Sequence, residues 1–133
     1  MKVRAIIEKG SEMYGIRSDS IVGRCCLVGY GDTVEEARED FLVSVEEAIE
    51  DACEAGLKHP SIDEIKVMFT YDLPSFFNYF DIINTSKFAA YVGINESKMR
   101  QYKSGLAYPG EKTTRKIMAA VKKLGSELSA VSL

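Results

Sequence analysis

The chain has 133 residues, of which 46% are hydrophobic and 28% are charged, and its formal net charge is −3 at pH 7. This composition is that of a folded globular protein rather than a disordered one, with length for one ordinary domain or two small ones. No apolar run approaches the ~20 residues of a membrane-spanning helix, and the charged N-terminus MKVRAIIEKG lacks the core of a signal peptide, so we expect a cytoplasmic protein without a membrane partner.

The charge is divided unequally along the chain. Residues 1–72 contain 8 Lys and Arg against 16 Asp and Glu, whereas residues 73–133 contain 9 against 4. An acidic half joined to a basic half indicates two domains with different partners. The basic half favours binding to a polyanion such as a nucleic acid.

The cysteines indicate neither a disulfide framework nor a metal site. Cys25 and Cys26 are adjacent and Cys53 is distant, and together with the single histidine, His59, they match no zinc-ligand spacing. His59 lies beside Pro60 in a polar stretch without a nucleophile or acid partner, and we assign it no role. We therefore expect reduced, mostly buried thiols, no metal and no cofactor.

Three short strands are predicted before the first helix. In Lys2–Lys9, the apolar residues Val3, Ala5 and Ile7 occupy alternate positions, which places their side chains on one face of a strand. A turn leads to a second strand over Met13–Ser18, and the polar cluster at 18–20 predicts a bend. Cys25–Tyr30 forms a third strand, which the following Gly-Asp pair ends. Strands this short reverse into antiparallel pairs through tight turns.

An amphipathic helix over Thr33–Ala55 is the clearest element of the sequence. Thr33 and Glu36 fit a capping box, in which each side chain accepts a hydrogen bond from the other's backbone N–H, and Gly56 ends the helix. Apolar residues recur at steps of three and four: Val34, Ala37, Phe41, Val45, Ala48, Ile49 and Ala52. The outer face is acidic, with Glu35, Glu36, Glu39, Asp40, Glu46, Glu47, Glu50, Asp51 and Glu54 opposed only by Arg38. A solvated surface explains such a face, and a docking face for a basic partner is the alternative.

A fourth strand is predicted where apolar residues alternate, at Ile65, Val67, Phe69 and Tyr71. The order β-β-β-α-β gives a small α+β domain, in which the helix covers one face of an antiparallel sheet. The residue before a proline is pushed out of helical geometry, so Asp72–Pro74 is the predicted junction. The domains are then residues 1–72 and an all-α domain at residues 73–133.

The second half is organised around Asn84–Gly110, which predicts two short helices joined by a tight turn. Asn84 or Thr85 can cap the first helix, and Asn95 can cap the second. Gly93 suits the turn, because glycine adopts a left-handed conformation without steric cost. A helix over 75–83 is expected to cover this pair with Phe76, Phe77, Phe80 and Ile83. A later helix over 112–124 turns Ile117, Ala120, Val121 and Leu124 inward, and the apolar residues Leu128, Val131 and Leu133 suggest packing within the molecule or across a dimer.

This pattern predicts a helix-turn-helix whose second helix, Asn95–Ser104, enters the major groove of DNA. Arginine is suited to guanine, and glutamine to adenine, through paired hydrogen bonds. The residues expected to reach base edges or adjacent phosphates are Ser97, Lys98, Arg100 and Gln101. Those expected to contact phosphates, which fixes register without reading sequence, are Thr85, Asn95 and Lys103. The alternative is that these are ordinary exposed residues of a helical protein-binding module.

Two family resemblances cover nearly the whole chain. The segments MKVRAIIEKG, YGI and GDTVEEAREDFLVSVEEAIEDACEAG resemble the antitoxin of the HicA–HicB toxin–antitoxin pairs. Phe88-Ala89, Gly93-Ile94 and Lys103-Ser104-Gly105 followed by Pro109 resemble the DNA-binding domains of Cro/cI (Xre-type) repressors. The resemblance implies a degraded RNase H-like domain that binds a small basic HicA-like RNase toxin. It also implies a tail that binds the operator of its own operon as a homodimer or higher homo-oligomer.

The sequence predicts no catalytic residues and no enzyme. An RNase H-like active site needs several carboxylates that converge on metal ions, whereas these acidic residues lie mainly along one helix. The alternative to an antitoxin is a stand-alone helix-turn-helix transcriptional regulator, whose N-terminal domain dimerises or senses a ligand.

Overall fold

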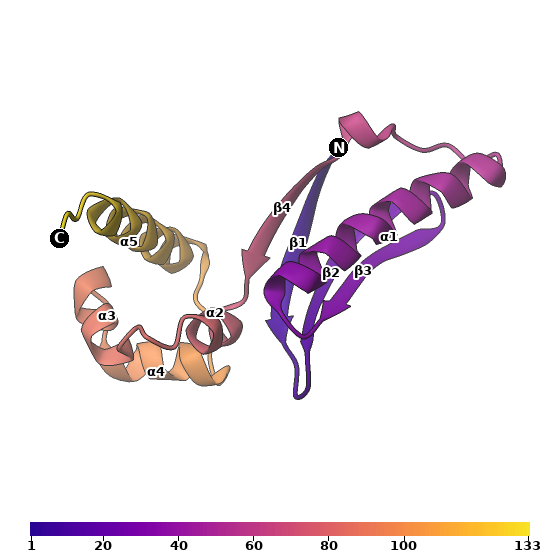
Figure 1. The fold of residues 1–133 in the computed structure, drawn as a ribbon. Coiled ribbons are helices and arrows are strands. Elements are labelled where there is room, and N and C mark those ends of the chain that lie inside the picture. Colours follow the sequence, from indigo (N-terminus) through magenta and orange to yellow (C-terminus); the bar gives the residue numbers. More distant parts are fainter. The chain divides into compact units, whose positions relative to one another are not determined.

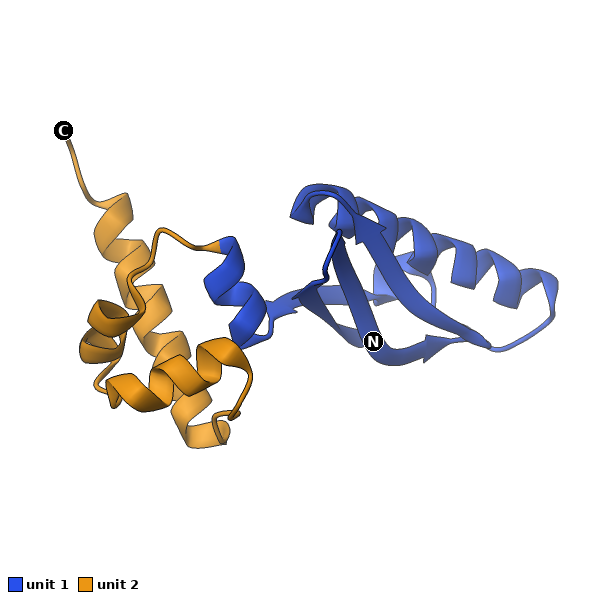
Figure 2. Cartoon of the chain, turned by 90° about the horizontal axis from the view of Figure 1, so that it is seen from below, with its two compact units in different colours: residues 1–79 blue, residues 80–133 orange.

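The computed structural model describes all 133 residues and divides them into two compact units, Met1–Tyr79 and Phe80–Leu133 (Figure 2). It contains one four-stranded sheet and five α-helices, which confirms a chain of mixed α and β structure. None of the helices combines the length and the apolar character needed to cross a membrane.

The first unit is built on a mixed sheet, with strand order β3-β2-β1-β4 (Figure 1). Its strands are β1 (Lys2–Lys9), β2 (Tyr14–Val22), β3 (Cys25–Gly31) and β4 (Lys66–Tyr71). β1 pairs antiparallel with β2, and β2 with β3, but β4 runs parallel to β1. The predicted antiparallel sheet is therefore wrong for β4. The helix after β3 returns the chain to the end where β3 began, so the next strand runs in the direction of β3 and β1.

β2 is longer than predicted. The bend expected at 18–20 lies inside the strand, where the register against β3 shifts between Arg17 and Ile21. Within this shift, the Ser18 hydroxyl accepts a hydrogen bond from the backbone N–H of Ser20 at 3.1 Å. A local irregularity of this kind lets polar residues remain in a strand that would otherwise stop.

One helix, α1 (Val34–Glu54), covers one face of the sheet (Figure 1). The core between them confirms both predicted periodicities, because Val3, Ala5 and Ile7 of β1 are buried against the apolar stripe of α1. The buried residues of that stripe are Val34, Ala37, Phe41, Val45, Ala48 and Ala52.

Both ends of α1 are formed by the residues that the sequence predicted, but one hydrogen bond of the capping box differs. The Thr33 hydroxyl accepts from the backbone N–H of Glu36 at 3.1 Å, as predicted. The Glu36 carboxylate instead accepts from the backbone N–H of Asp32 at 3.0 Å, so the reciprocal half of the capping box is displaced by one residue. Gly56 (φ +69°) ends the helix, and the N–H of Leu57 donates to the Ala52 carbonyl at 2.8 Å.

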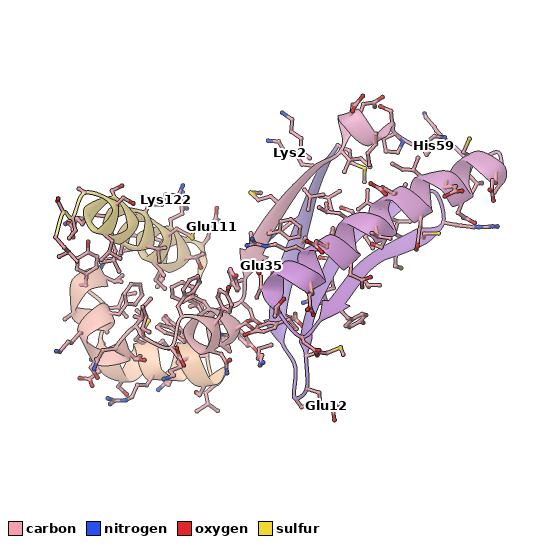
Figure 3. All side chains as sticks on the ribbon, viewed as in Figure 1. Lys2, Glu12, Glu35, His59, Glu111 and Lys122 are labelled. Carbon is pink, nitrogen blue, oxygen red and sulfur yellow. The ribbon has the colours of Figure 1, made fainter.

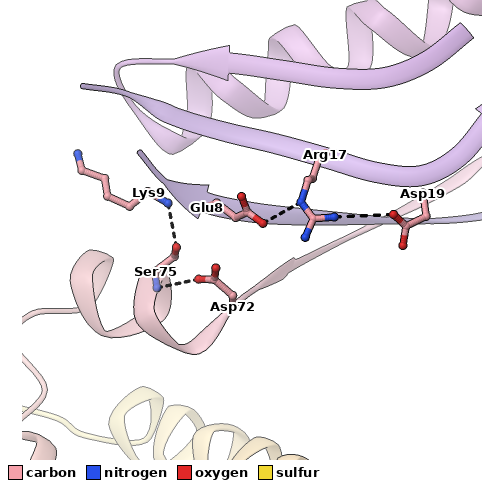
Figure 4. A network of polar contacts seen from close by, with 6 residues as sticks. All are labelled: Glu8, Lys9, Arg17, Asp19, Asp72 and Ser75. Atoms are coloured by element: carbon pink, nitrogen blue, oxygen red, sulfur yellow. Dashed lines mark hydrogen bonds and ion pairs between the residues drawn. The ribbon is translucent and has the colours of Figure 1, made fainter. Parts of the chain in front are cut away.

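The short helix α2 (Leu73–Tyr79) belongs to the sheet unit, although the sequence placed residues 73–79 in the second domain. The Ser75 hydroxyl accepts from the backbone N–H of Lys9 at 2.8 Å, and the Asp72 carboxylate accepts from the N–H of Ser75 at 2.8 Å (Figure 4). Phe77 is buried. The junction therefore lies after Tyr79 and not at Asp72–Pro74. Pro74 does not end the first domain, because it stands in the first turn of α2, where proline is tolerated.

The second unit contains α3 (Thr85–Val92), α4 (Glu96–Ser104) and α5 (Glu111–Ser129). Its buried side chains are Phe88, Ala89, Val92, Met99, Tyr102 and Ile117. Of the four residues predicted to face inward on α5, only Ile117 is buried, and the others are partly exposed. The terminal residues Leu128, Val131 and Leu133 are exposed, so they do not pack within this unit.

No disulfide joins the three cysteines, and they are not mostly buried as the sequence predicted. Cys25 is partly buried, whereas Cys26 and Cys53 are exposed. Cys26 alternates with the buried Leu27 and therefore lies on the sheet face that α1 leaves uncovered.

Candidate functional site

The α3–α4 pair is positioned by two asparagine caps and one glycine turn. The Asn84 side chain accepts from the N–H of Lys87 at 2.9 Å, and the Asn95 side chain accepts from the N–H of Lys98 at 3.2 Å. Gly93 (φ +86°) ends α3 in the left-handed region. Asn84, rather than Thr85, is thus the cap of α3.

Burial decides which face of α4 is free. Met99 and Tyr102 are buried, so the opposite side of the helix is left to solvent. The predicted DNA-contacting residues Ser97, Lys98, Arg100 and Lys103 are all exposed, whereas Gln101 is partly buried. The Lys98 ammonium lies 5.8 Å from the centroid of the Tyr102 ring, a cation–π distance.

Thr85 and Asn95 are less free than predicted. The Thr85 hydroxyl is buried without a hydrogen-bond partner, so it does not face a phosphate. The side-chain oxygen of Asn95 is occupied by the cap of α4, which leaves its amide nitrogen as the donor for a phosphate. The sequence pattern could not separate these roles, because capping and phosphate binding use the same short polar residues.

Arg100 has a partner that sequence reasoning missed. Its Nη1 donates to Glu96 Oε1 at 2.6 Å, and the Ser86 hydroxyl of α3 donates to the same oxygen. The hydrogen bond from Ser86, followed by the charge of Arg100, holds the pKa of Glu96 below its ordinary value. The i,i+4 spacing of Glu96 and Arg100 was a visible signal for the ion pair.

Most cations of the helical unit have no acidic partner. Its three ion pairs join Arg100 to Glu96, Arg115 to Glu111 and Lys123 to Glu127. Lys116 instead donates to the Gly93 carbonyl at 3.0 Å, which helps to close the α3–α4 turn. The remaining lysines are exposed: Lys87, Lys98, Lys103, Lys112 and Lys122 (Figure 3 labels Lys122). Unneutralised cations around α3, α4 and α5 favour a polyanionic ligand.

The loop after α4 carries two exposed apolar side chains, which were not among the residues predicted to bind a ligand. Leu106 is 83% exposed and Tyr108 is 80% exposed. Single exposed apolar residues are common on protein surfaces, and these two carry no role here.

The sheet unit carries a second candidate surface on the outer side of α1. We define the α1 acidic surface as Glu39, Leu42, Val43, Glu46, Glu47 and Glu50. Leu42 is 44% exposed and Val43 is 47% exposed, and each has Glu39 and Glu46 three or four residues away. An apolar centre with a charged rim is the usual composition of a protein–protein interface.

The charges of the α1 acidic surface are not neutralised within the chain. None of its four glutamates forms an ion pair, and Glu46 and Glu50 stand at i,i+4, where like charges cost roughly 0.2–0.5 kcal/mol. Arg38, the one basic residue of α1, instead lies with its guanidinium carbon 5.3 Å from the centroid of the Phe69 ring. The surface is therefore open to a basic partner.

Two further features bear on a metal or catalytic site: the grouping of possible metal ligands, and the contacts of His59. No three His, Cys, Asp or Glu side chains gather in a group that could hold a metal ion. His59 contacts the carbonyl of the adjacent Pro60 at 2.9 Å through Nδ1.

Comparisons with protein-family models, curated proteins and solved structures found no match for this chain. What the α4 face and the α1 acidic surface bind is therefore inferred from their own chemistry.

Proposed function

We propose that the protein is a HicB-type antitoxin, which binds and neutralises a small basic HicA-like RNase and represses its own operon by binding operator DNA. The observation that carries this proposal is the separation of two surfaces of opposite charge onto two compact units. In this proposal, the sheet unit is a degraded RNase H-like domain that holds the toxin. The helical unit is a Cro/cI-like helix-turn-helix that reads the operator.

The exposed face of α4 supports the DNA-binding half of the proposal. Its donors can bond to base edges in the major groove, where Arg100 suits guanine and Gln101 suits adenine. Lys103 and the amide nitrogen of Asn95 suit phosphates, which fix the position of the helix without reading sequence. Two copies of the unit would read half-sites about one duplex turn, ~34 Å, apart.

The α1 acidic surface supports the toxin-binding half. A basic protein gains electrostatic attraction to its glutamates, which speeds encounter and excludes acidic partners. Leu42 and Val43 offer the apolar area that a charged rim alone lacks.

The decisive experiment for the toxin is co-expression with the product of the neighbouring gene, followed by sizing of the purified complex. We expect a stable complex and relief of the toxicity that the neighbour causes when expressed alone. DNA binding without any complex or relief would instead identify a stand-alone regulator.

The DNA half is tested with a duplex from the region upstream of the gene, in a gel-shift assay at physiological salt. The double variant Lys98→Ala, Arg100→Ala should bind roughly tenfold or more weakly, because it removes a guanine-suited donor and a cation. The matched control, Lys2→Ala with Lys58→Ala, removes the same charge from exposed positions of the sheet unit. Equal affinity of both double variants would contradict the assignment of α4.

A further inference from the structure

Glu96 lies on α4 at a position where its negative charge would disfavour the proposed ligand, DNA. It is the only acidic residue of α4, and it lies in the first turn of the helix that would enter the major groove. A negative charge there repels the DNA phosphates, although the positive end of the helix dipole tolerates it.

The contacts of Glu96 indicate its role. A single oxygen, Oε1, accepts from Arg100 Nη1 at 2.6 Å and from the hydroxyl of Ser86. Ser86 belongs to α3 and Arg100 to α4, so the carboxylate is held from the neighbouring helix while it holds the arginine. The Arg100 side chain is 59% exposed, and the ion pair uses only one of its two terminal nitrogens. The rest of the guanidinium fork stays available for a ligand.

We infer that Glu96 is a positioning residue, which fixes the Arg100 guanidinium in one orientation so that its free edge can form a paired hydrogen bond with guanine. This inference rests on the proposed DNA-binding function. An arginine side chain gives up considerable rotamer freedom when it is ordered, and a carboxylate that orders it before binding removes part of that cost from the DNA complex. Ser86 serves the same end by fixing the carboxylate.

The same unit contains a matched pair that lacks these features. Glu111 and Arg115 also stand at i,i+4, on α5, but their nearest atoms are 3.6 Å apart and no third residue holds the carboxylate. Removing Glu111 therefore changes the net charge as removal of Glu96 does, without releasing an ordered arginine.

The test is selection of bound sequences from a randomised duplex pool, followed by affinity measurements on the selected duplex and on an unrelated one. The wild-type protein should enrich guanine at one position of each half-site, and Arg100→Ala should lose that preference. Glu96→Ala should reduce the preference for guanine at that position at least about fivefold, the lower end of what a paired contact provides. Its affinity for the unrelated duplex should rise, because one repulsive charge is gone.

Two conservative variants separate positioning from charge. Ser86→Ala leaves the charge unchanged and should lose part of the guanine preference. Glu96→Gln keeps an acceptor oxygen and should retain more of the preference than Glu96→Ala. Glu111→Ala should raise affinity for both duplexes and leave the base preference intact.

The outcomes distinguish the two levels of the proposal. If Glu96→Ala behaves as Glu111→Ala does, with higher affinity and unchanged guanine preference, Glu96 forms a plain helix ion pair and the inference is overturned. If the wild-type protein enriches no sequence, it is the proposed DNA-binding function that fails. Circular dichroism of each variant shows whether α4 remains folded.

Discussion

At the scale of single residues, Gly29 shows how closely α1 lies over β3. A Cβ atom on Gly29 would stand 2.4 Å from the backbone nitrogen of Phe41 and 2.5 Å from the carbonyl oxygen of Ala37. Both neighbours are backbone atoms of a helix, which cannot turn aside as a long side chain can. The spacing between sheet and helix therefore depends on the absence of a side chain at this position.

We expect Gly29→Ala to lower the free energy of unfolding by about 1–3 kcal/mol or more, because an overpacked core must shift backbone. Urea unfolding followed by circular dichroism measures the effect. Gly125→Ala is the control, since nothing lies within 4 Å of its added Cβ and alanine favours the helix by about 1 kcal/mol. Equal stability of Gly29→Ala and wild type would contradict the observed packing.

Asp51 of α1 forms an ion pair with Arg24 at the surface of the sheet unit. Two hydrogen bonds join Arg24 to its carboxylate, at 2.9 and 3.0 Å. Together with a contact from the Cys25 thiol, they hold the pKa of Asp51 below its ordinary value. A carboxyl whose pKa is lower in the folded state stabilises the fold above its unfolded pKa, and that stability is lost as the pH falls through the folded pKa.

Asp51→Asn should therefore have a lower Tm than wild type at pH 7, and the difference should shrink as the pH falls below the ordinary range of an aspartate. The effect should be modest, because the pair lies at the surface. Thermal unfolding across the pH range tests this. Asp63→Asn is the control, since Asp63 is exposed and its side chain forms no hydrogen bond or ion pair. A difference in Tm that persists unchanged at acid pH would rule out the ion pair as its source.

At the scale of elements, α1 has two faces with different tasks. Its inner stripe closes the core of the sheet unit, and its outer side carries the α1 acidic surface. The helix has acidic residues in its first turn, where they are favourable, but no basic residue in its last turn. The outer side is thus not arranged for the stability of the helix alone.

If the proposed toxin docks on the α1 acidic surface, the double variant Leu42→Ser, Val43→Ser should fold normally and bind it at least about tenfold more weakly, because the variant removes the apolar centre of the surface. Calorimetry or surface plasmon resonance gives the Kd. Met68→Ser is the control, because Met68 is 57% exposed and alternates in β4 with the residues that face the core. Wild-type affinity of the double variant would place the toxin on another surface.

At the scale of the whole molecule, the extent of the sheet unit depends on α2. Tyr79 stacks on Tyr71 with ring centroids 5.8 Å apart, and its ring stands perpendicular to that of Tyr14 with centroids 5.9 Å apart. The Ser75 hydroxyl accepts a hydrogen bond from the backbone N–H of Lys9, the last residue of β1. These contacts tie α2 to the sheet, in agreement with its place in the first unit.

A fragment of residues 1–79 should therefore fold by itself, whereas a fragment of residues 1–72 should be less stable. The fragment of residues 1–72 lacks both ring contacts of Tyr79 and the hydrogen bond between Lys9 and Ser75, each of which contributes about 0.5–1.5 kcal/mol. Urea unfolding of the two purified fragments compares them directly. If both unfold at the same urea concentration, α2 does not stabilise the sheet unit.

Local patterns of the sequence determined much of this protein. The bounds of α1, the cap at Asn95 and the turn at Gly93 depend on residues within a few positions of one another, which a reader of the sequence can see. The alternating faces of β1 and the helical stripe of α1 follow from fixed periodicities in the same way.

Only the tertiary structure decided which distant residues meet. The parallel pairing of β4 with β1, the attachment of α2 through Ser75 and the bond from Ser86 to Glu96 all join separate elements. Such contacts depend on how whole elements pack, which no local spacing specifies. The same packing exposed Cys26 and Cys53, buried the hydroxyl of Thr85 and turned Arg38 toward Phe69. It thereby left the α1 acidic surface without a cation of its own.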